Sequence, residues 1–190
     1  MVRIVLSSLL LLSFTLPSVA RAEGVYWTTK SVLKDFFHSS ERVTFVEVNG
    51  DDVARLTGER SGRSKYVVFV ATTGERIDGY AIIDDEKGQH LPITFAVKVD
   101  ADGRVARTEV MVYREGHGDE IREPRFQKQY RGKGPGDALR FGDDVVAVSG
   151  ATISSRSMTK AVRRAVALVD VVRGQKAVRT HASLPAPPQG

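Results

Sequence analysis

The residues best suited to binding chemistry lie in one stretch, 145–156, where an apolar run passes through a turn of small residues into a long helical pattern. Gly150 and Ala151 let another molecule approach the backbone closely. Beside them lie the free N–H groups of a first helical turn, which attract phosphate. Hydroxyl groups join them from Ser149, Thr152, Ser154 and Ser155. The same residues also suit a plain Ser/Thr-capped helix after a glycine turn, so spacing alone leaves both interpretations open.

The sequence after this turn predicts the long helix that positions these hydroxyls. Apolar residues recur on one stripe from Ser154 to about Arg173, and basic residues lie on the opposite face. The stripe consists of Met158, Val162, Ala165, Val166, Val169 and Val172. Gly174 is expected to end the helix, because glycine is common just beyond a helix C-terminus.

Ahead of the turn, the chain predicts a meander of β-strands. Strand-like stretches separated by turn residues occupy 42–48, 65–72, 77–84, 92–100 and 105–114. The short connections between the last four favour antiparallel pairing, because a parallel crossover needs a dozen or more residues. The expected fold class is therefore α+β, an antiparallel β-sheet with flanking helices.

Three shorter helices are expected around this sheet. Thr28 or Thr29 can cap the first, which would cover the core as a lid. Its apolar face consists of Val32, Leu33, Phe36 and Phe37. A short helical turn begins at Asp51–Asp52, and Pro124, which suits the first helical position, opens a helix that ends near Gly132.

The N-terminus predicts an export signal. A cationic start at Met1–Arg3 precedes a 13-residue apolar run and then Ala20-Arg21-Ala22, the small-x-small pattern of a signal-peptidase site. The alternative, an uncleaved anchor, would need to cross roughly 30 Å of hydrocarbon, which 13 helical residues do not reach. The expected organisation is a signal peptide at 1–22, an N-terminal helix, strand and short helix at 23–60, the main domain at 61–174, and a disordered tail at 175–190.

Composition excludes several kinds of cofactor and partner. The chain has no cysteine, which rules out disulfides, thiolate metal sites and Cys-ligated redox centres. No metal is expected either, because the spacing of His90, His117, Asp119 and Glu120 matches no standard zinc signature. The net charge of +5 falls to +3 without Arg3 and Arg21, so we expect no nucleic-acid partner. The basic run from Arg122 to Lys133 is interpreted as a solvated face, with phosphate or partner binding as the alternatives.

The tetrad Ser149-Gly150-Ala151-Thr152 resembles the second half of the Asp-x-x-(Ser/Thr)-Gly-Ala-Thr motif of the FMN-binding domain family. This family is found in subunits of the sodium-pumping NADH:quinone oxidoreductase and the Rnf complex, and in the regulator of nitrous oxide reduction. The resemblance covers roughly residues 64 to 170. Its other segments, in the family's order, are Gly79–Tyr80, His90–Ile93, Tyr113–Glu115 and Arg125–Lys133.

The resemblance implies a cofactor and the residues that hold it. FMN would be attached through its phosphate to Thr152 by a flavin transferase, with Ser149, Gly150, Ala151, Ser154 and Ser155 around the attachment point. It also implies contacts with the flavin from Gly118, Glu120, Ile121, His90 and Tyr80. The alternatives are a solvated loop at 116–120 and a structural role for His90.

The chain departs from the family motif at one position. The family aspartate corresponds to Val146, with Asp143 and Asp144 just upstream, and Asp144 is a candidate to serve instead. Because that aspartate is associated with recognition by the transferase, Val146 bears on covalent attachment and not on the fold.

The resemblance implies an exported, periplasmic or extracytoplasmic electron carrier that is membrane-associated through its redox partner. It would relay electrons between a membrane oxidoreductase and an extracytoplasmic acceptor, and flavin needs no protein thiol for this. The alternative is a flavin-free binding or scaffold module of the same fold. A stand-alone enzyme has less support, since no nucleophile–base arrangement or paired carboxylates are visible.

Overall fold

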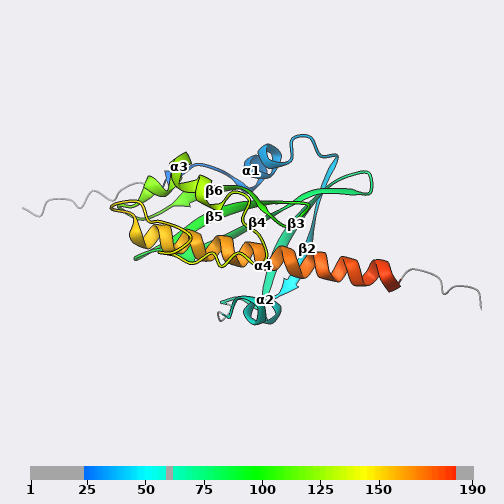
Figure 1. Ribbon diagram of the computed structural model, residues 1–190. Coiled ribbons are helices and arrows are strands. Elements are labelled where there is room, and N and C mark those ends of the chain that lie inside the picture. Colours follow the sequence, from blue (N-terminus) through cyan, green and yellow to red (C-terminus); the bar gives the residue numbers. More distant parts are fainter. Residues whose placement is uncertain (1–23, 59–61, 183–190) are drawn as a thin grey trace, which may run out of the picture.

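The computed structural model describes residues 24–58 and 62–182 (Figure 1). The expected signal peptide at 1–22 lies outside the described residues, as does the last part of the expected tail, 183–190.

A single antiparallel sheet forms the centre of the structure, in the order β1-β6-β5-β4-β3-β2. After the edge strand β1, each strand pairs with the next along the chain, so the predicted meander and the α+β class are confirmed. The two-residue β1 was not predicted, because so short a segment has no periodicity to detect. The strands are β1 (Gly24–Val25), β2 (Arg42–Asn49), β3 (Lys65–Thr73), β4 (Arg76–Lys87), β5 (Pro92–Asp100) and β6 (Val105–Tyr113).

Helix α1 (Thr29–Phe36) covers one face of the sheet (Figure 1). Its start follows from a capping box, in which Thr28 and Ser31 each accept a hydrogen bond from the other's backbone N–H. The helix packs on a surface of mostly small residues, which lets it approach closely and confirms the predicted lid. The buried cluster consists of Val32, Phe36, Phe37, Ala71, Ala81, Ala96 and Met111.

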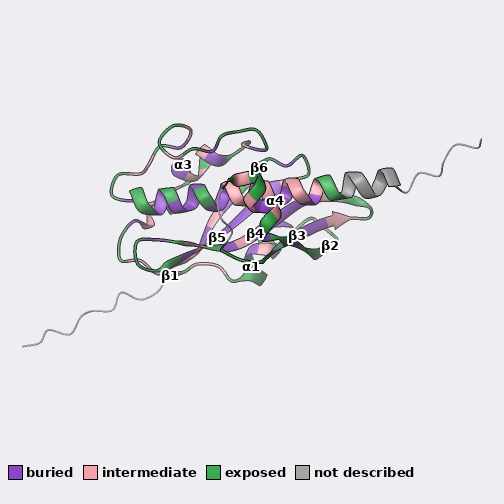
Figure 2. Ribbon diagram, turned by 90° about the horizontal axis from the view of Figure 1, so that it is seen from below, coloured by how far each residue is buried: buried purple, intermediate pink, exposed green. Residues whose placement is uncertain are grey.

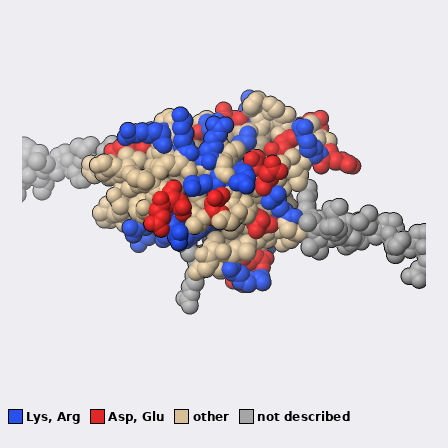
Figure 3. Space-filling view, in the orientation of Figure 1, with Lys and Arg blue, Asp and Glu red and all other residues tan. Residues whose placement is uncertain are grey.

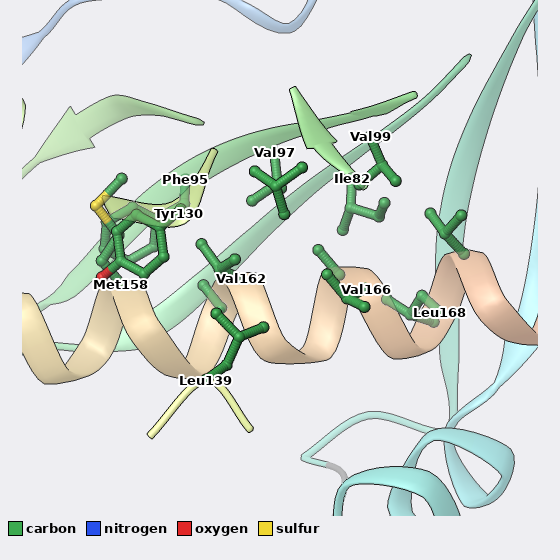
Figure 4. Packing of buried hydrophobic residues seen from close by; sticks show 14 of the residues in the cluster. Ile82, Phe95, Val97, Val99, Tyr130, Leu139, Met158, Val162, Val166 and Leu168 are labelled. Atoms are coloured by element: carbon green, nitrogen blue, oxygen red, sulfur yellow. The ribbon is translucent and has the colours of Figure 1, made fainter. Parts of the chain in front are cut away.

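Helix α4 (Thr152–Ala182) lies along the opposite face and forms the main core (Figures 1 and 4). Buried and exposed residues alternate along its first six turns, as the predicted stripe requires (Figure 2). Met158, Val162 and Val169 are fully buried against sheet residues such as Phe95 and Val97. None of the helices in the described part of the chain is both long and apolar enough to cross a membrane.

The predicted end of this helix is wrong, because α4 continues through Gly174 to Ala182. A glycine inside a helix costs only about 1 kcal/mol relative to alanine. The residues that follow, Gln175 to Val178, are compatible with a helix and outweigh that cost. Residues 175–182, expected to be part of a disordered tail, are therefore helical.

Short helical segments complete the structure. Helix α2 (Gly50–Thr57) begins one residue before the expected turn, because Asn49 caps it. The helix predicted from Pro124 consists of α3 (Pro124–Gln127) continued by the 3-10 turn η2 (Lys128–Tyr130), and a further 3-10 turn, η1 (Asp119–Arg122), precedes it. Because α3 and η2 lie near the first residue of α4, they form part of the end of the molecule at which the site is expected (Figure 1).

Candidate functional site

The tetrad 149–152 forms a tight turn that ends in the first residue of α4. The Ala151 N–H donates to the Val148 carbonyl at 3.0 Å, and Gly150 adopts a φ of +82°. The Ser155 N–H to Ala151 carbonyl bond, at 2.8 Å, is the first of the helix. The N–H groups of residues 152–154 therefore precede the intrahelical ladder. Thr152 is exposed, and no atom lies within 4 Å of a Cβ built on Gly150, so this turn is open to another molecule.

A hydrogen-bond network under this turn holds the predicted residues Ser154 and Gly118 together. The Tyr113 hydroxyl donates to the His117 carbonyl and lies 2.8 Å from the Ser154 hydroxyl, which then acts as the donor to Tyr113. Burial raises the pKa of Tyr113, although the Ser154 hydrogen bond acts in the opposite direction. Tyr113 thus remains a neutral phenol that ties β6 to the first turn of α4.

Gly118 fits this network because it has no side chain. Its φ is +99°, and an added Cβ would lie 2.7 Å from the Ser154 hydroxyl oxygen and 2.8 Å from that of Tyr113. Replacing Gly118 with alanine is therefore expected to lower the free energy of unfolding by about 2–3 kcal/mol, from backbone strain and the disrupted hydrogen bonds.

Gly150→Ala is the matched control for this prediction, because Gly150 shares the positive φ but has open space around it. We expect it to cost about 1 kcal/mol from backbone strain alone. Urea unfolding of both variants measures the difference, and equal losses would show that the contact of Gly118 with Ser154 and Tyr113 is not tight.

The loop at 88–91 is fixed at the same end of the molecule. One oxygen of Glu115 accepts hydrogen bonds from the backbone N–H groups of His90, at 2.6 Å, and Leu91, at 2.8 Å. Burial disfavours the Glu115 carboxylate, but these hydrogen bonds outweigh it and hold the pKa of Glu115 below its usual value. On α4, the Ser157 hydroxyl donates to the Lys87 carbonyl at 2.6 Å. The exposed side chain of His90 is thereby positioned near the start of α4.

The other predicted residues differ in their access to a ligand. Ile121 and Ser155 are fully buried, so their side chains support the site from inside the core. Glu120 is half-buried, and one of its carboxylate oxygens has no hydrogen-bond partner among the described residues. That oxygen is an acceptor still available to a bound group.

Tyr80 is not brought to this end of the molecule. It is 1% exposed in the core under α4. Burial raises its pKa, and the nearby Arg173, close to the other end of α4, acts against that rise. Residues 152 and 173 are roughly 30 Å apart along a helix. We therefore leave Tyr80 out of the candidate site.

The chain around Val146 is gripped by its backbone while its side chain faces solvent. The Gln129 amide donates to the Val146 carbonyl at 3.1 Å and accepts from the Val146 N–H at 2.9 Å. Val146 is 66% exposed. Asp144 is already engaged, because its carboxylate accepts from the Arg140 N–H at 2.8 Å. Position 146 therefore offers an accessible side chain, whereas Asp144 holds a local turn.

Three residues missed from the predicted site, Tyr113, Glu115 and Gln129, hold its parts together. All three lie in segments that carry the family resemblance. Their roles depend on hydrogen bonds to residues between 17 and 41 positions away, which no local pattern reveals.

These features fit a flavin nucleotide. The open turn and the N–H groups at the start of α4 suit a phosphate. Exposed apolar side chains lie directly beside it, Ile153 at 46% exposure and Val146 at 66%, and can contact a planar ring. A pocket of about 280 Å³ extends this surface and is lined by Arg125, Phe126, Gln129, Val146, Ala147, Val148 and Ser149.

Comparison with known proteins gives matches over this same region. One protein of the proton-translocating ferredoxin:NAD(+) oxidoreductase complex from Clostridium ljungdahlii is 30% identical over 116 residues, which cover 57% of this chain and 62% of that relative. The chain thus spans less than two thirds of the length of that relative.

Two solved structures are also similar. Shewanella oneidensis NqrC has 20% identity and a TM-score of 0.48, over 68% of this chain and 80% of that one. The corresponding component of the Na(+)-translocating NADH-quinone reductase from Parabacteroides distasonis has 22% identity and a TM-score of 0.45, over 67% and 75%.

A family model covers the site itself. Residues 88–167, from the loop bound by Glu115 to the middle of α4, match the FMN-binding domain. The matched segment contains Gly118, Glu120 and the tetrad that ends in Thr152. Through residues 88–167, the chain belongs to the FMN-binding domain family.

Proposed function

We propose that this protein is an exported electron carrier whose FMN is attached by a phosphoester to Thr152. The observation that carries the proposal is the exposed hydroxyl of Thr152 on the first residue of α4, inside the matched FMN-binding domain. The relative from Clostridium ljungdahlii is named as part of a proton-translocating oxidoreductase complex. We infer from it that a membrane oxidoreductase is the redox partner, with an extracytoplasmic acceptor.

Attachment requires a transferase and an activated flavin nucleotide. The Thr152 hydroxyl loses its proton, its oxygen forms a bond to phosphorus, and the bond from phosphorus to the leaving group breaks. With a flavin dinucleotide as donor the leaving group is AMP, so the protein gains one FMN less water. No electrons are transferred in this step.

The residues of the chain hold and orient the cofactor, which supplies one- or two-electron chemistry. The N–H groups of the first turn of α4 face the phosphate position. The hydrogen bond between Tyr113 and Ser154 fixes that turn, and Glu115 fixes the 88–91 loop beside it. An ester to Thr152 also prevents loss of the cofactor outside the cytosol.

Flavin that survives acid precipitation tests the attachment. The protein is expected to be yellow when produced with a flavin transferase, and its fluorescence should remain in the pellet after acid treatment. A colourless protein under these conditions would contradict the proposal.

A flavin-free binding module is the second candidate, and Val146 is the observation that favours it. If the flavin has been lost, the protein produced with the transferase stays colourless and does not bind free FMN tightly. Tight binding of added FMN would count against this candidate.

Replacing Val146 with aspartate is expected to raise the fraction of flavin-loaded protein, because it restores the family motif at an exposed position. Its backbone bonds to Gln129 do not involve the side chain, so the unfolding free energy should change by less than about 0.5 kcal/mol. Intact-mass measurement gives the loaded fraction. Val146→Asn is the control, and an equal rise with asparagine would show that the carboxylate is not what the transferase recognises.

A further inference from the structure

The segment 121–133 holds most of the positive charge of the protein. Its five basic residues and one acidic residue give a net charge of +4, whereas the rest of 23–190 sums to −1. We define the basic face as Arg125, Lys128, Arg131 and Lys133. Figure 3 shows Lys and Arg side chains gathered along the edge of the molecule where α3 lies. The three-residue spacing of the first three places them on one side of α3 and η2.

The inner side of α3 and η2 is fixed to the core, which gives the basic face a defined shape. Phe126 and Tyr130 are buried and contact each other edge to face, with centroids 5.6 Å apart. The Tyr130 hydroxyl lies 2.9 Å from that of Thr159 on α4. The cations therefore project from a rigid support.

Most of these cations have no internal partner. Lys128, Arg131 and Lys133 make no hydrogen bond or ion pair through their side chains with any described residue. Arg125 pairs with Glu123 at 2.8 Å, but both side chains are solvent-exposed, so the pair stabilises the fold little. The charge is thus available to an outside partner.

A pocket of about 290 Å³ opens between the basic face and β6. Lys128, Arg131 and Gln127 line it, together with Thr108 on β6. Thr108 is 2% exposed, and its hydroxyl has no hydrogen-bond partner among the described residues. A buried polar group without a partner is costly, and a carboxylate that entered the pocket would accept from this hydroxyl and from both cations.

The basic face adjoins the cofactor site. Arg125 and Gln129 line the neighbouring pocket with Val146 and Ser149, three residues before Thr152. Exposed Val146 and Ile153 thus form an apolar area next to a charged border. Transient protein interfaces have this arrangement, an apolar centre with a polar rim.

We propose that the basic face docks an acidic redox protein and that the pocket beside Thr108 receives one of its carboxylates. The inference rests on the proposed electron-carrier function. A protein partner fits better than a lipid surface, because Phe126 and Tyr130 point into the core and leave α3 and η2 no apolar face to insert into a bilayer. Complementary charge of this kind raises association rates.

The test uses a defined acidic probe, a fluorescein-labelled octaglutamate peptide, with the flavin-free protein. Fluorescence anisotropy is expected to show binding that weakens with added salt. Lys128→Glu combined with Arg131→Glu should weaken it about tenfold. Lys30→Glu combined with Lys34→Glu, an equal change in charge on α1, should weaken it less than about twofold. Thr108→Val, which keeps the shape of the side chain, should weaken it about threefold.

Equal weakening by the two double variants would reduce the effect to net charge and overturn the proposal. Unchanged binding in Thr108→Val would overturn it by removing the pocket. Binding to phosphatidylglycerol vesicles through the basic face, with no binding of the peptide, would assign the face to a membrane instead. The peptide assay needs no flavin, whereas intact mass reports flavin attachment, so failure of this inference is distinguishable from failure of the proposed function.

Discussion

Replacing Thr152 with alanine is expected to abolish covalent flavin attachment completely. The neighbouring hydroxyls cannot substitute, because those of Ser154 and Ser155 are buried. Since Thr152 is exposed, the free energy of unfolding should fall by no more than about 1 kcal/mol. Intact-mass measurement after production with a flavin transferase would show the unmodified mass for the variant.

Two matched variants make this prediction specific. Thr152→Ser keeps a hydroxyl and should retain some attachment. Ser149→Ala removes the other exposed hydroxyl of the tetrad and should leave attachment in place. Flavin retained at full level in Thr152→Ala would show that another residue is the acceptor.

Replacing Phe95 with alanine is expected to give the largest loss of stability, about 4 kcal/mol. Phe95 is 1% exposed in β5 and lies near Tyr130 and Met158 under α4 (Figure 4). The cavity would weaken packing between the sheet and the helix that carries Thr152. Urea unfolding measures the change, with the slope of free energy against urea expected to stay constant.

Phe45→Ala provides the control for this prediction, because the same atoms are removed from a side chain that is 63% exposed in β2. Its unfolding free energy should change by about 0.5 kcal/mol or less. Similar losses in the two variants would mean that the core under α4 is not the main source of stability.

Local sequence patterns were sufficient to predict most of the fold. The turn residues and short connections led to the meander, and the apolar stripe led to α4. The end of α4 was missed because the glycine rule compares local preferences, and Gly174 is followed by residues that continue the helix. The division of the 124–132 helix into α3 and η2 also depends on packing, since Phe126 and Tyr130 are both drawn into the core.

The candidate site was predictable only where its residues are neighbours in the sequence. The turn at 149–152 and the loop that contains Gly118 were found in this way. The contacts that join them depend on the folded sheet, as with Tyr113 and Ser154, which are 41 positions apart. Tyr80 was included because it lies in a segment that resembles the family, but the length of α4 separates it from Thr152.

Peptide mapping of the protein from its native host tests the central claim most directly. Trypsin is expected to release residues 141–156, between Arg140 and Arg156, in one peptide that contains Thr152. Our account predicts that this peptide carries the mass of one FMN less water and that fragmentation places the added mass on Thr152. An unmodified peptide, or FMN attached to a serine, would contradict it.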